Sequence, residues 1–145
     1  MATIGSSAVG AYFVGLQGNP HGNPQNHLAY IDQTIHLSPE ASSNGFTVTF
    51  KRCGRPGYGE PAITVMVSDA SASVWHTCWQ EDTVSDTTFV QKTCTIPASI
   101  ASSLGGTMIL RVQNTGSSDV DGFTGDKMLF LDDFQLAALS PGAQP

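Results

Sequence analysis

The sequence predicts an all-β protein built as a two-sheet antiparallel β-sandwich of about eight strands. Short segments of alternating apolar and polar residues recur along the chain, and Gly, Pro, Asn, Ser and Asp fill the stretches between them. Charged residues make up 12% of the chain, against about 25% in an average soluble domain. With so few charges, the outer faces of the secondary-structure elements must be largely neutral and polar. This is typical of strands, because surface helices usually carry many charges.

The clearest strand covers residues 46–53, where Phe46, Val48 and Phe50 fall on one face. A helical period is almost absent, and the only candidate is 97–104, which would form a connector of a turn or two. The eight predicted strands cover residues 11–16, 27–37, 46–53, 63–67, 74–80, 88–96, 107–113 and 127–136.

The length of 145 residues fits one ordinary domain that buries a real core. No linker divides the sequence, so we expect a single sandwich over residues 1–139. Residues 140–145 are rich in Pro and Gly and read as a C-terminal tail or linker.

The charge of the chain argues against nucleic-acid and membrane partners. The net charge is -6, and the densest basic cluster is Lys51, Arg52 and Arg55, which is too small to neutralise a row of phosphates. No apolar run approaches the roughly 18–20 residues that a transmembrane helix needs, so we expect no membrane insertion.

Three cysteines, Cys53, Cys78 and Cys94, are present without a Cys-x-x-Cys pair. This argues against a zinc ribbon or a thioredoxin-type site. Either one disulfide with one free thiol, or three buried thiols, fits the sequence.

Several segments together resemble one known family. Residues 11–18 with 31–37, then 46–50 with 55–57, then 63–69, and finally 129–136 are similar, in this order, to segments of galactose-binding-like jelly-roll domains. That family includes many carbohydrate-binding modules and cell-wall-associated domains. The resemblance implies a jelly roll, a glycan or polysaccharide partner, and an extracellular or surface-exposed location.

The resemblance also bears on calcium and on assembly. Family members usually begin with a strand that carries an Asn-Gly-x-Phe-Glu motif, which the first ten residues here lack. A missing first strand leaves a sheet edge that a neighbouring protein chain would fill. In the family an Asp of the closing strand commonly holds a structural calcium, so Asp132 and Asp133 are the candidate calcium ligands.

Trp75 and Trp79 are the strongest candidates for ligand contacts. Strict alternation puts both on one face of the 74–80 strand, and His76, Cys78 and Gln80 on the other. If the tryptophan face is exposed, the two indoles form a platform for sugar rings; if it faces inward, both belong to the core.

The other candidate binding residues are polar. His76 and Gln80 offer hydroxyl-binding groups, and Tyr58 lies in a loop near Arg55. The arginines Arg52, Arg55 and Arg111 either bind sugar hydroxyls or carboxylates, or form structural ion pairs with Asp132 or Asp133.

No metalloprotease, nucleophile-elbow, P-loop or Rossmann motif occurs in the chain. We therefore expect a protein without enzyme activity, a lectin-like carbohydrate-binding module. The alternative is a structural or protein-interaction domain of a surface fibre, capsid or cell-wall assembly.

Overall fold

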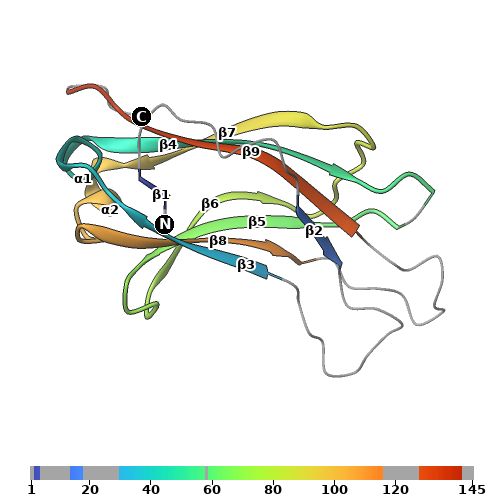
Figure 1. Cartoon of the computed structure of the whole chain (residues 1–145), viewed down its shortest axis with the longest axis horizontal. Helices are drawn as coiled ribbons and strands as arrows, with labels where there is room; N and C mark the ends of the chain where they lie inside the picture. The colour runs from blue at the N-terminus through green and yellow to red at the C-terminus, as the bar shows by residue number, and fades with distance from the viewer. Residues whose placement is uncertain (1, 4–13, 18–29, 58, 116–127, 142–145) are drawn as a thin grey trace.

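The computed structural model describes residues 2–3, 14–17, 30–57, 59–115 and 128–141. Two β-sheets form the upper and lower layers of a sandwich, and two short helices, α1 (Pro39–Asn44) and α2 (Ala98–Ala101), lie together at one end (Figure 1). The strands are β1 (Ala2–Thr3), β2 (Val14–Gln17), β3 (Tyr30–His36), β4 (Gly45–Gly54), β5 (Ile63–Asp69), β6 (Trp75–Glu81), β7 (Val90–Pro97), β8 (Thr107–Asn114) and β9 (Met128–Ala138).

The strand order is β1-β3-β8-β5-β6 in the five-stranded sheet and β2-β9-β4-β7 in the four-stranded sheet. Neighbouring strands are antiparallel, except that β1 runs parallel to β3 and pairs only with Ile35 and His36. The predicted all-β sandwich is therefore confirmed, and each of the eight predicted segments overlaps a strand. The short β1 was not predicted.

The helix after β3 was also not predicted, although the sequence contains its start signal. The side chain of Ser38 accepts a hydrogen bond from the Ala41 amide at 3.1 Å, and Pro39 occupies the first turn. The helix ends at Gly45, which has a φ of 89°. The predicted connector at 97–104 is confirmed by α2.

The core lies between the two sheets. Phe46, Val48 and Phe50 of β4 are fully buried and face Ile63, Val65 and Val67 of β5, among others. The predicted inward face of the 46–53 strand is thus confirmed, and period-two alternation is what places one residue in two inside.

Two β-bulges interrupt this alternation. In β6, Trp79 pairs with Val65 while Thr77 pairs with the next residue, Met66, so Cys78 is an extra residue in the ladder. In β9, the ladder with β4 shifts between Thr49 and Lys51, next to Asp133, whose φ is 57°. Each bulge reverses the face on which the following side chains lie.

A disulfide between Cys78 and Cys94 joins β6 to β7, which are edge strands of different sheets. Cys53 is a buried free thiol, and its burial raises its pKa. Of the two arrangements that the sequence left open, the structure contains one disulfide with one free thiol. Within the described ranges, neither helix approaches the length and apolarity needed to cross a membrane.

Candidate functional site

The outer face of the five-stranded sheet carries the candidate site. Ile35 is buried between the sheets, so alternation along β3 turns Tyr30 and Asp32 outward. In β8, Leu110 and Val112 are buried, and Arg111 between them points outward. Trp75, at the start of β6, reaches the same face.

Arg111 lies between two aromatic rings. The carbon at the centre of its guanidinium group is 4.0 Å from the centroid of the Tyr30 ring and 4.3 Å from that of Trp75. Tyr30 comes from β3 on one side of β8, and Trp75 comes from β6 on the other side, beyond β5. Cation–π attraction favours this arrangement, because each ring face is electron-rich.

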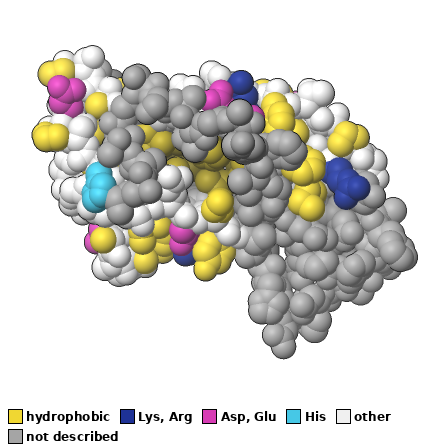
Figure 2. All heavy atoms as spheres, viewed as in Figure 1, with side chains coloured by type: hydrophobic (Ala, Val, Ile, Leu, Met, Phe, Trp, Pro, Cys, Tyr) yellow, Lys and Arg dark blue, Asp and Glu magenta, His cyan; other side chains and the backbone are white. Residues whose placement is uncertain are grey.

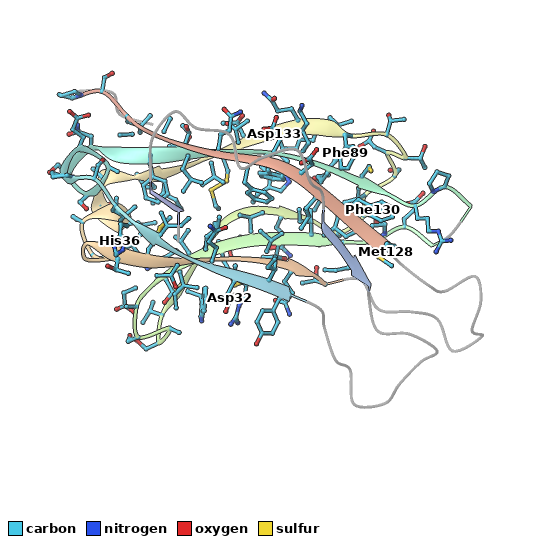
Figure 3. The ribbon with its side chains drawn as sticks, viewed as in Figure 1. Asp32, His36, Phe89, Met128, Phe130 and Asp133 are labelled. Atoms are coloured by element: carbon cyan, nitrogen blue, oxygen red, sulfur yellow. A yellow bond between two sulfur atoms is a disulfide. The ribbon has the colours of Figure 1, made fainter. Side chains whose placement is uncertain are left out.

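Asp32 fixes the guanidinium from the adjacent strand. Arg111 donates from Nε to Oδ1 at 2.7 Å and from Nη2 to Oδ2 at 2.9 Å, and the two residues are direct partners in the β3–β8 ladder. The hydrogen bonds to Asp32 raise the pKa of Arg111. Figure 3 shows Asp32 on the outer side of its sheet, away from the four-stranded sheet. We call Tyr30, Asp32, Trp75 and Arg111 the aromatic–arginine site.

Trp79 does not belong to this site. It packs against the core cluster, contacts Phe50 edge-on at a centroid distance of 6.3 Å, and donates its indole N–H to Glu81 at 2.8 Å. The prediction that Trp75 and Trp79 share a face is wrong, because the bulge at Cys78 shifts the alternation between them. The sequence left a sugar platform or a core position open for the pair; the structure places Trp79 against the core and Trp75 on the outer face, against Arg111.

Arg52 is buried at 2% exposure and links the two sheets by contacting Glu81 of β6 from β4. It donates to both oxygens of Glu81 at 2.7 and 2.6 Å and to Asp86 at 2.6 Å. We call these three residues the Arg52 clasp, which joins β4 to β6 and to the loop after β6. The prediction that Arg52 and Arg111 form ion pairs with Asp132 or Asp133 is wrong. Arg52 pairs with Glu81 and Asp86, and Arg111 pairs with Asp32. The hydrogen bonds from Arg52 hold the pKa of Glu81 below its usual value.

Two of the other predicted ligand-binding residues, His76 and Gln80, are not brought together. His76 pairs with Val67, on the inner face, and Gln80 pairs with Thr64, on the outer face, so the prediction that they share a face is wrong for the same reason as above. Gln80 donates to Asp82 at 3.4 Å. Arg55 is exposed in the loop after β4, and Tyr58 lies outside the described residues. Glycan contact by these residues stays a prediction.

Asp132 and Asp133 lie in β9 of the other sheet. The Asp132 carboxylate accepts a hydrogen bond from the Asp133 amide at 2.8 Å, and Asp133 forms an ion pair with Lys51 at 3.1 Å. Figure 3 shows Asp133 on the opposite side of the sandwich from Asp32. The described ranges contain no group of three or more His, Cys, Asp or Glu residues suited to a metal ion. Calcium takes six to eight oxygen ligands, and the Asp133 carboxylate is already paired with Lys51, so calcium binding here would require ligands beyond these two residues. Calcium stays a prediction of the family resemblance.

Two of the four residues of the aromatic–arginine site, Tyr30 and Asp32, were not predicted as ligand-binding, and Arg111 was predicted either to bind sugar hydroxyls or carboxylates or to form an ion pair. Two signals existed in the sequence. Tyr30 and Asp32 are two residues apart in a predicted strand, which puts them on one face, and Arg111 interrupts an otherwise apolar strand centre. What alternation does not give is which strands are neighbours, and the site depends on β3, β8 and β6 lying in one sheet.

The described lysines and arginines on the face shown in Figure 2 are isolated from one another and form no basic patch.

No protein-family model and no curated protein sequence matches the chain. Solved structures do resemble it. A CBM4 domain aligns over 92% of this chain and 78% of its own, at 11% identity and a TM-score of 0.58. The CBM22-1 xylan-binding domain of Paenibacillus barcinonensis Xyn10C aligns over 94% and 81%, at 14% identity and a TM-score of 0.52. The C-terminal domain of EclA, a sugar-binding protein, aligns over 88% and 80%, at 16% identity and a TM-score of 0.53. The chain thus has the β-sandwich fold of carbohydrate-binding modules, and the resemblance to jelly-roll domains is confirmed for the fold.

Proposed function

We propose that this protein is a non-catalytic domain that binds a glycan on the outer face of its five-stranded sheet. The observation that carries the proposal is the aromatic–arginine site, in which Tyr30 is 52% exposed beside Trp75 and Arg111. Sugar rings stack their C–H faces on aromatic side chains, and the guanidinium and carboxylate of Arg111 and Asp32 offer a donor and an acceptor for hydroxyl groups.

The comparisons support the same reading. Two of the structures that share this fold at a TM-score above 0.5 are described as a xylan-binding domain and as a sugar-binding protein. The disulfide between Cys78 and Cys94 favours an extracellular or surface-exposed location, because such bonds persist in oxidising compartments.

The test is binding to a panel of soluble polysaccharides, including xylan, galactan and mixed-linkage β-glucan, by affinity electrophoresis and titration calorimetry. Trp75→Ala is expected to weaken binding at least about tenfold, since the loss of one stacked ring costs about 1.4 kcal/mol or more. The matched control is Phe89→Ala, which removes another exposed aromatic side chain, next to β7 of the four-stranded sheet. Binding of none of the panel, or equal binding by wild type and both variants, would overturn the proposal.

A structural or protein-interaction role is the second candidate. It is favoured by the edge of the five-stranded sheet, where, among the described residues, β1 pairs with two of the seven residues of β3. An open strand edge recruits strands from other chains. Concentration-dependent assembly in light scattering, together with a negative glycan panel, would favour this role.

A further inference from the structure

The aromatic–arginine site has no unpaired positive charge. Arg111 is the only lysine or arginine in β3, β5, β6 and β8, and Asp32 neutralises it through two hydrogen bonds. The chain as a whole carries a net charge of -6. An acidic sugar that approaches this face therefore meets Asp32 and a negative protein, and no unpaired lysine or arginine of these four strands offsets them.

The orientation of Arg111 limits how a ligand reaches its charge. Tyr30 and Trp75 lie against the guanidinium from either side, and Nε and Nη2 donate to Asp32. The remaining nitrogen, Nη1, has no acceptor among the described residues. A ligand is thus expected to meet the guanidinium at its Nη1 edge.

Asp32 supplies an acceptor next to this donor edge. Its side chain is 35% exposed, and each carboxylate oxygen accepts more than one hydrogen bond. A hydroxyl group both donates and accepts, so two adjacent hydroxyls of one sugar fit the pair, one accepting from Nη1 and the other donating to Asp32. A sugar carboxylate or sulfate only accepts, and it is repelled by Asp32.

We infer that the site selects neutral glycans with adjacent hydroxyl groups, and that Asp32 is the residue that excludes acidic ones. The inference rests on the proposed glycan-binding function and adds the chemical class of the ligand. Asp32 acts in two ways, because it neutralises Arg111 and also offers the acceptor that a hydroxyl needs.

The experiment compares polymers that differ only in charge. Native glucuronoxylan is compared with its carboxyl-reduced form, and saponified polygalacturonate with its methyl-esterified form, at pH 7.5 and low salt. Wild type is expected to bind the neutral member of a pair at least about tenfold more tightly. Asp32→Asn is expected to reduce the preference for the neutral polymer at least about fivefold, because the positive charge of Arg111 is then no longer neutralised. The binding that this variant gains for the acidic polymer should weaken as the NaCl concentration is raised.

The matched control is Glu60→Gln, which changes the net charge by the same amount at an exposed residue of the loop between β4 and β5. It is expected to leave the preference as in wild type. Circular dichroism checks that each variant is folded. Arg111→Lys keeps the charge but loses the planar fork, and it is expected to lose binding to the neutral polymer.

The outcomes separate the two claims. If wild type binds glycans through Trp75 but Asp32→Asn and Glu60→Gln shift the preference equally, or not at all, the inference about Asp32 is wrong while the proposed function stands. A wild type that prefers the acidic member of each pair also overturns the inference. If no polymer in either pair binds and Trp75→Ala changes nothing on the wider panel, the proposed function itself fails.

Discussion

Trp75 and Trp79 are four residues apart on β6 and lie on opposite faces of the five-stranded sheet, because Cys78 is an extra residue in the ladder with β5. The bulge places the two tryptophans in different surroundings. Trp75 lies against Arg111 on the outer face, whereas Trp79 packs on the core beside Phe50. Replacing each one in turn should therefore affect different properties of the protein.

Trp79→Ala is expected to lower the free energy of unfolding by about 3 kcal/mol, the cost of removing a large aromatic side chain from a core, and to leave the Trp75 face in place. Trp75→Ala is expected to change the unfolding free energy by no more than about 1 kcal/mol, since it removes a surface cation–π contact. Urea denaturation of both variants measures the difference. Equal destabilisation by the two substitutions would contradict the assignment of the two faces.

The bulge also explains where prediction from the sequence succeeded and where it failed. Alternation identified all eight segments and the buried face of β4, because Phe46, Val48 and Phe50 repeat every second residue without interruption. It failed after Cys78, because one extra residue reverses the phase and the composition of β6 does not signal it. Partners such as Arg52 with Glu81, or Arg111 with Asp32, depend on strand order, which no local pattern contains.

The Arg52 clasp predicts a defined pH dependence of stability. Arg52 lowers the pKa of Glu81 in the folded protein from an ordinary value of 4.5. The stabilisation by this carboxylate is therefore complete above pH 4.5, and it is lost as the pH falls through the lower folded-state pKa. Glu81→Gln is expected to destabilise the protein at pH 7 by about 3 kcal/mol, because the buried positive charge of Arg52 then loses one of its two carboxylate partners.

Below pH 4.5 the difference between wild type and Glu81→Gln is expected to narrow, because wild type then loses the same charge. Urea denaturation between pH 7 and pH 3 tests this, with the exposed Glu60→Gln as the control. A difference that stays constant over the whole range would show that the clasp does not depend on the charge of Glu81.

The family resemblance predicts that calcium binds at Asp132 and Asp133. On that prediction, millimolar calcium raises the melting temperature relative to EDTA, because a ligand that binds only the folded state stabilises it. The increase is expected to disappear in Asp132→Asn and in Asp133→Asn. Magnesium is the control cation, since it is smaller and demands a stricter octahedral geometry. A melting temperature that is the same in calcium and in EDTA would remove these two residues as calcium ligands.

The disulfide between Cys78 and Cys94 fixes the bulge residue of β6 to the opposite sheet. Its sequence separation of 16 residues closes a loop for which chain entropy predicts about 3 kcal/mol of stabilisation. Reduction of wild type, or the double substitution Cys78→Ala and Cys94→Ala, is expected to lower the unfolding free energy by about that amount. The reductant should have no further effect on the double variant, because its remaining cysteine, Cys53, forms no disulfide. A reductant that destabilises the double variant as much as wild type would mean that the effect does not come from this bond.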